Sequence, residues 1–248
     1  MKKISVFVFA LLLVLQSCTE PMEVTMMCYN VRGCRSDSGV IDYDRFVDVI
    51  SKYDVDFVSL QELDSVTVRS NHTSNGHELA QRLDMEFTFA SAIDFSGGKY
   101  GIGLLSREKP ISTIKIYLPS QSERRALLIA EFEDIYMGVT HLPLSDEERV
   151  EAIRLIKLQV DGLNDKPLVL SGDFNAEPTS EPIIEICKDF TPLSSFDEFT
   201  FSANNPTVTI DYVFGYNNGY SFDVKSYEVL QAKGVSDHLP LLISFQVK

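Results

Sequence analysis

A short apolar strand that runs into Gly-Asp-Phe-Asn, at Leu168–Asn175, constrains this chain more than any other stretch. Its first residues form an uninterrupted apolar run, which is typical of a buried strand. Gly172 then permits a close approach of backbone or ligand. Asp173 and Asn175 alternate with Phe174, so in an extended chain they project to the same side. Glycine, aspartate and asparagine are also common turn residues, so this stretch alone fits a turn as well as a functional site.

The chain is long enough for one large domain with a real core. It has 248 residues, of which 44% are hydrophobic and 23% are charged. We see no linker rich in proline, glycine or serine, no short repeat and no low-complexity tract. We therefore expect a single folded domain over residues 24–248.

The N-terminal residues have the pattern of a secretion signal. Two lysines precede the apolar run Ile4–Leu15, which is too short to span a membrane as a mature helix. The run leads into Leu-Gln-Ser-Cys18, which resembles a bacterial lipobox, where the chain is cut before a cysteine that then carries lipid. We expect a lipoprotein signal peptide at 1–17, a tether at 18–23 and a membrane anchor on Cys18, on the periplasmic or outer-membrane face of the cell envelope. An ordinary secretion signal with an incidental cysteine fits the same pattern.

Three cysteines remain beyond Cys18, namely Cys28, Cys34 and Cys187. This is an odd number in a compartment that permits disulfides. A Cys28–Cys34 bridge and buried free thiols both fit the sequence.

The charge of the chain bears on its partners. Its 22 lysines and arginines stand against 36 acids, for a net charge of −14, and removal of residues 1–17 would leave 20 against 36, or −16. Such a surface repels phosphate polymers and lacks the basic footprint of a nucleic-acid binder. A nucleic-acid substrate is therefore disfavoured. A local cleft that is basic or holds a metal ion would override the repulsion between the acidic surface and the phosphates.

Apolar periodicity predicts strands alternating with helices in both halves of the chain, with hairpin-like strands between them. The predicted strands are 24–31, 55–60, 87–92, 102–106, 111–118, 125–133, 135–141, 168–173, 209–214 and 241–247. The predicted helices are 43–52, 76–83, 145–163 and a short one that ends at Cys187. Ser145, with Glu148 three residues later, predicts a capping box at the start of the third helix. This order predicts an α/β layered protein with mixed sheets.

Side chains suited to catalysis stand at six strand ends or strand-end loops. They are Asn30, Glu62, His141, Asp173 with Asn175, Asp211, and Asp237 with His238. Loops at strand ends carry functional sites because a rigid sheet positions them. Asp211 also lies within an apolar run, where an acid is costly unless it has a partner. Six such positions, all occupied by acids, amides or histidines, are not explained by the residue preferences of turns alone.

These motifs resemble those of the endonuclease/exonuclease/phosphatase superfamily. The matching segments are Asn30 after a strand, Gln61-Glu62, Thr140-His141, Gly172–Asn175, Ile210–Tyr212 and Ser236–His238. They occur in the order of that family and extend over essentially the whole mature chain. The resemblance implies a DNase-I-like four-layer α/β sandwich, in which two facing mixed β-sheets are flanked by helices. It also implies a metal-dependent phosphoesterase site at one edge.

The resemblance implies a metal site made of oxygen ligands. Glu62 would be the principal ligand, assisted by Asn30 and, on the other side, by Asp237. An all-oxygen set of ligands suits Mg²⁺ or Mn²⁺, with waters completing the octahedron.

The resemblance also implies the catalytic roles. Asp173 would accept a proton from the attacking water or orient it, and Asn175 would donate to a phosphate oxygen. His238, held by Asp211, would stabilise the charge that develops on the phosphate. His141 would contact the phosphate or the leaving group.

Departures from the family patterns narrow the substrate. Ser171 stands where inositol-polyphosphate phosphatases of this family have a tryptophan, and Thr209–Tyr212 replaces their Trp-Cys-Asp-Arg block. No convincing equivalent exists for the membrane-binding aromatic hairpin of sphingomyelinase-like members. Arg69 either meets an anionic substrate group or is a solvated surface residue.

Three functions fit the sequence. The leading one is a Mg²⁺-dependent, monomeric phosphodiesterase or phosphatase of the cell envelope that acts on a small or lipid-linked phosphate ester. The second is an extracytoplasmic DNase-I-like nuclease. The third, from a different class, is a catalytically inactive binding module on the same scaffold.

Overall fold

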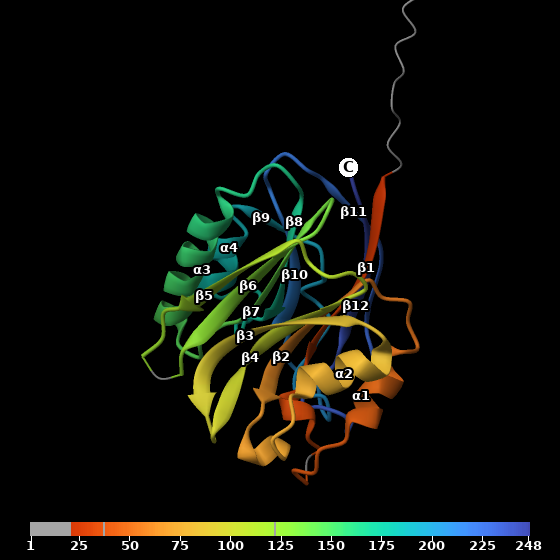
Figure 1. The fold of residues 1–248 in the computed structure, drawn as a ribbon. Coiled ribbons are helices and arrows are strands. Elements are labelled where there is room, and N and C mark those ends of the chain that lie inside the picture. Colours follow the sequence, from red (N-terminus) through yellow and green to blue (C-terminus); the bar gives the residue numbers. More distant parts are fainter. Residues whose placement is uncertain (1–20, 37, 122) are drawn as a thin grey trace, which may run out of the picture.

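The computed structural model describes residues 21–36, 38–121 and 123–248. The predicted signal peptide at 1–17 and Cys18 lie outside these residues. Within them, the chain forms two six-stranded sheets that face each other, and Figure 1 shows helices on their outer sides. This is the predicted four-layer α/β sandwich of the DNase-I type. No helix in the described ranges is long and apolar enough to cross a membrane.

The first sheet has the strand order β11-β12-β1-β2-β4-β3. Its strands are β1 (Met22–Asn30), β2 (Phe57–Ser65), β3 (Glu86–Phe95), β4 (Gly98–Ser106), β11 (Phe222–Val229) and β12 (Leu241–Val247). β1 and β2 are parallel and the other neighbouring pairs are antiparallel. Helix α1 (Tyr43–Ile50) connects the parallel pair, as a parallel crossover requires.

The second sheet has the order β5-β6-β7-β8-β10-β9 and repeats this plan. Its strands are β5 (Ser112–Leu118), β6 (Arg125–Glu131), β7 (Tyr136–His141), β8 (Leu168–Asp173), β9 (Phe190–Pro192) and β10 (Asp211–Tyr216). The parallel pair is β7 and β8, joined through helix α3 (Asp146–Val160). Helices α2 (Asn75–Leu83) and α4 (Glu181–Ile186) complete the outer layers, and η1 (Arg32–Cys34) and η2 (Val68–Ser70) are single 3₁₀ turns.

Alternation along β1 explains why the sheet is buried on both faces. Met26 and Cys28 belong to the core between the two sheets, whereas Met27 and Tyr29 pack into the core under α1. A third cluster fills the space between the second sheet and α3 with α4. Three apolar layers therefore separate the four structural layers, and they fix the strand ends where the site lies.

The structure corrects several predicted elements. β9 and β11 were not predicted from the sequence, and the first of these has only three residues. β11 is an edge strand in which only Val229 is buried, so it lacks the regular apolar alternation that reveals a half-buried strand. β3 and β4 are also longer than predicted, because their outer ends are polar hairpin residues.

The predicted capping box at α3 is wrong in one of its two bonds. The Ser145 hydroxyl accepts from the Glu148 backbone N–H at 3.4 Å, as predicted. The Glu148 carboxylate does not bond back to Ser145. It accepts from Ser120 Oγ at 3.1 Å and from the Gln121 N–H at 2.6 Å instead, which ties the β5–β6 loop to the helix.

The three cysteines within the described residues are free thiols. Cys28 and Cys34 are buried and Cys187 is partly buried, with no disulfide between them. Of the two states that the sequence left open, the structure has the buried free thiols.

Candidate active site

The two parallel strand pairs bring their carboxyl ends to one edge of the sandwich. β1 ends at Asn30, and β7 and β8 end at the register partners His141 and Asp173. Glu62 does not follow a strand end as predicted, because β2 continues to Ser65 and Glu62 lies inside it at an irregularity. β10 runs antiparallel to β8 and places Asp211 directly opposite Asp173. Residues far apart in the sequence therefore meet because both sheets end at the same place.

Asn30 connects the two sheets. Its side-chain nitrogen donates to Glu62 Oε1 at 3.2 Å and to Asp173 Oδ2 at 3.0 Å. Its Oδ1 accepts from the backbone N–H of Arg32 at 3.1 Å, which fixes the orientation of the amide. In this arrangement Asn30 orients two carboxylates, and it would have to turn its oxygen inward to act as a metal ligand itself.

Glu62 owes its direction to an irregularity in β2. The pairing of β2 with β4 shifts between Leu60 and Leu63, and Glu62 has a positive φ of 61°. A bulge of this kind re-aims a side chain, and a non-glycine residue in the left-handed region is often part of a functional site. The Glu62 carboxylate consequently faces Asn30 and stays partly accessible.

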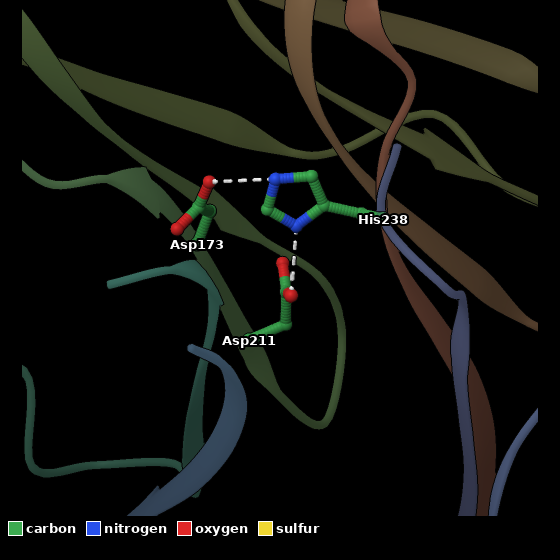
Figure 2. Close-up of side chains that lie close together, drawn as sticks. All are labelled: Asp173, Asp211 and His238. Atoms are coloured by element: carbon green, nitrogen blue, oxygen red, sulfur yellow. Dashed lines mark hydrogen bonds and ion pairs between the residues drawn. The ribbon is translucent and has the colours of Figure 1, made fainter. Parts of the chain in front are cut away.

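Asp211 and His238 form a buried pair. His238 Nδ1 lies 2.9 Å from Asp211 Oδ2, and His238 Nε2 lies 3.6 Å from Asp173 Oδ2, as Figure 2 shows. Burial alone would lower the pKa of His238, but the carboxylates of Asp211 and Asp173 outweigh it and raise the pKa to about 10. His238 is therefore an imidazolium at neutral pH.

His141 approaches the same carboxylate from β7, with its Nε2 3.4 Å from Asp173 Oδ2. Burial, the Arg125 guanidinium and His238 all lower the pKa of His141 well below its usual value. Burial also raises the pKa of Asp173, against the opposing effect of His238. Asp173 thus lies between one neutral and one charged histidine, and its raised pKa suits a general base.

Asn175 is held in the left-handed region at φ 50°. Its backbone N–H donates to Asp173 Oδ1 at 2.9 Å, and its amide nitrogen donates to the Leu142 carbonyl at 2.9 Å. Arg149 donates to the Asn175 carbonyl. One amide hydrogen of the partly exposed Asn175 is therefore engaged and one is available for another acceptor.

Asp237 lies at the rim of the site. Its carboxylate is 3.4 Å from Arg32 Nε, and both side chains are 34% exposed. Ser236 Oγ donates to the Asn30 carbonyl at 2.7 Å, which fastens the Asp237–His238 segment to the end of β1. The structure thus gathers every predicted site residue at this one edge.

The donor set fits a hard divalent cation at the more open part of the site. Glu62 and Asp237 supply accessible carboxylate oxygens, which Mg²⁺ and Mn²⁺ prefer. A second grouping, Asp173, Asp211 and His238, has its ligand atoms within 4.8 Å of one another. In this second grouping His238 Nδ1 already bonds Asp211 Oδ2, and all three side chains are buried, so the accessible carboxylates are the better place for a cation.

Two residues near the site have roles that the sequence analysis did not assign. Arg125 opens β6, is buried, and has its Nη1 3.4 Å from His141 Nδ1. The only sequence signal was an arginine at the first position of an apolar strand. Arg69 is partly exposed; its Nε donates to both oxygens of the buried Asp64 and its guanidinium lies over the Phe95 ring.

Residues 27–238 match the model of the "Endonuclease/Exonuclease/phosphatase family". Comparison with curated protein sequences found no match.

Several solved structures share the fold. An endonuclease/exonuclease/phosphatase family protein from Bacteroides thetaiotaomicron has 17% identity and a TM-score of 0.74, over 92% of this chain and 98% of that one. The mannosyl-6-phosphatase Bt3783 of Bacteroides thetaiotaomicron VPI-5482 has 18% identity and a TM-score of 0.72, over 91% and 99%. D. rerio TDP2, complexed with a single-strand DNA product, has 19% identity and a TM-score of 0.70, over 90% and 98%. With a family match over most of its length, the chain belongs to the endonuclease/exonuclease/phosphatase family.

Proposed function

We propose that this protein is a Mg²⁺- or Mn²⁺-dependent hydrolase of phosphate esters, a phosphodiesterase or phosphatase that acts on a small or lipid-linked ester in the cell envelope. The observation that carries the proposal is the contact of Asn30 with both Glu62 and Asp173. It joins the predicted metal site on one sheet to the predicted base on the other, next to the Asp211–His238 pair.

The cation would be held by Glu62 and Asp237, with Asn30 beside them orienting Glu62. When bound, it would polarise a phosphate oxygen and offset the negative charge that develops there. Glu62 and Asp237 are both only partly buried, which leaves them open to a substrate phosphate.

The remaining groups divide the work of in-line attack. Asp173 would orient the attacking water and take its proton, because burial strengthens this carboxylate as a base. The free amide hydrogen of Asn175 and the His238 imidazolium would donate to phosphate oxygens. Asp211 keeps His238 charged, and His141 would donate its Nε2–H to the phosphate or the leaving group.

Two competing functions receive less support. A nuclease would need a nucleic-acid path, and the net charge of −14 works against a long polyanion. TDP2, a fold relative, was solved with single-strand DNA, so nucleic acid stays in the substrate screen. A catalytically inactive binding module should have lost a metal ligand or a histidine, whereas this chain retains the whole set.

The test is a screen of phosphomonoesters, phosphodiesters, phospholipids and plasmid DNA, each with Mg²⁺, with Mn²⁺ and with EDTA. We expect hydrolysis of a non-nucleic-acid ester that is lost with EDTA and restored by either cation. Glu62→Gln should weaken the metal dependence and the rate together, because it removes a charge from the cation site. Glu78→Gln, on the outer helix α2, is the matched control and should behave as wild type. Full activity in EDTA would overturn the metal assignment, and efficient cleavage of plasmid DNA alone would favour the nuclease.

A further inference from the structure

The two histidines of the site face one carboxylate oxygen but have opposite partners behind them. Both Nε2 atoms lie near Asp173 Oδ2, at 3.4 Å for His141 and 3.6 Å for His238. Behind His238, the Nδ1 atom meets the carboxylate of Asp211. Behind His141, the Nδ1 atom meets the guanidinium of Arg125.

The partner of each ring nitrogen decides where the proton lies. A guanidinium has N–H donors and no acceptor, so His141 Nδ1 can only accept from Arg125. A neutral imidazole with an accepting Nδ1 carries its proton on Nε2. That proton then lies on the nitrogen that faces Asp173.

Arg125 is well placed to impose this choice. Its side chain is only 8% exposed and enters from the first residue of β6, in the sheet that also carries His141. Nη1 also donates to the Glu123 carboxylate, which fixes the guanidinium from the solvent side. Among the described residues, the buried Arg125 Nε has no hydrogen-bond partner, so the printed contacts of the guanidinium are those of Nη1 with Glu123 and His141.

We propose that Arg125 is a positioning residue that holds His141 as the Nε2–H tautomer. In this form His141 presents an N–H to Asp173 and, in the reaction, to the phosphate or the leaving group. Without Arg125, the proton would distribute between the two ring nitrogens, and the donor would be lost in part of the molecules. The catalytic part of this proposal rests on the proposed phosphoesterase function, whereas the tautomer itself does not.

The test is ¹⁵N NMR of the histidine rings in the full-length protein with Cys18→Ser, at neutral pH. The chain has four histidines, and His141→Gln identifies the His141 signals. We expect an unprotonated Nδ1 and a protonated Nε2 for His141. A protonated Nδ1 would overturn the proposal, whatever the enzymatic results.

Arg125→Met removes the guanidinium and keeps much of the side-chain volume. Arg124→Met is the matched control, because Arg124 is exposed, donates to the Ala92 carbonyl and stacks on Tyr117 instead of entering the site. We expect a mixture of His141 tautomers in Arg125→Met only. An unchanged His141 spectrum in a folded Arg125→Met protein would overturn the proposal. If that variant does not fold, the protonation of Nδ1 and Nε2 in the wild-type spectrum still tests the proposal.

The kinetic expectation separates this proposal from the proposed function. With a substrate that the screen identifies, Arg125→Met should lower kcat by about 10-fold or more and change KM less. This is the usual effect of losing a residue that orients a catalytic group. A folded Arg125→Met protein with wild-type kcat would overturn the positioning role. A wild-type protein without any phosphoesterase activity would overturn the proposed function and leave the tautomer intact.

Discussion

Asp211 is a buried acid whose negative charge is stabilised by a residue of the site, His238. It is 1% exposed within an apolar strand, and among the described residues its Oδ1 has no hydrogen-bond partner. Its other oxygen bonds His238, so the buried negative charge is balanced by an imidazolium. The sequence showed that this acid needed a partner, and the family resemblance supplied His238. Arg125 could not be found in the same way, since an arginine that opens a strand usually reaches solvent.

The Asp211–His238 pair predicts a pH effect. The Asp211 carboxylate helps to raise the pKa of His238 to about 10, so the charged form persists into alkaline solution. Asp211→Asn removes that charge, lowers the pKa of His238, and should shift the alkaline limb of the kcat profile to lower pH. The rate should fall while metal affinity is unchanged. A pH profile and kcat identical to wild type would mean that Asp211 is only structural.

The thiols predict a labelling pattern. Burial raises the pKa of Cys28 and of Cys34, and neither side chain is accessible to reagent. In a Cys18→Ser protein, a thiol reagent should modify Cys187 slowly in the native state and all three cysteines after unfolding in guanidinium. Rapid native labelling of Cys28 or Cys34 would contradict the packing described for β1 and η1.

At the scale of elements, the active site depends on how closely β7 and β8 approach. A Cβ on Gly172 would lie 2.0 Å from the Thr140 carbonyl oxygen, so no larger residue fits without separating the two strands. The sequence indicated that Gly172 permits a close approach, but not that the backbone of Thr140 makes it. The register of a parallel strand pair cannot be deduced from the sequence of either strand alone. The bulge that turns Glu62 was also beyond prediction, as it arises from the pairing of β2 with β4.

Gly172→Ala should therefore be costly. We expect a loss of about 2 kcal/mol or more in the free energy of unfolding, from overpacking against backbone that cannot move freely. Gly162→Ala is the control, because nothing lies within 4 Å of its Cβ position, and it should stay within about 0.5 kcal/mol of wild type. Urea unfolding followed by circular dichroism measures both, and equal midpoints for the two variants would refute the close-contact explanation.

Across the whole molecule, the sequence predicted the layered two-sheet fold and the residues that gather at the site. It could do so because the motifs that carry these residues occur in the order of a known family. It could not predict β11, whose polar face hides its strand character. The lipid anchor stays a prediction, since Cys18 lies outside the described residues.

The anchor can be tested by fractionation. The wild-type protein should partition with membranes and enter the detergent phase, because a lipid on Cys18 adds buried hydrocarbon that the folded domain lacks. Cys18→Ser should prevent lipidation and leave the protein in the aqueous phase. Identical fractionation of the two proteins would point to an ordinary cleaved signal and a freely diffusing enzyme.

β1 has one end near the predicted anchor and the other in the active site. The strand begins at Met22, four residues after Cys18, and ends at Asn30, eight residues further along. At about 3.3 Å per step its ends are roughly 26 Å apart. A lipid on Cys18 would thus hold the protein with its catalytic edge facing away from the bilayer. Esters that extend or diffuse into the aqueous space, long lipid-linked ones included, would reach this edge more readily than headgroup phosphates at the bilayer surface.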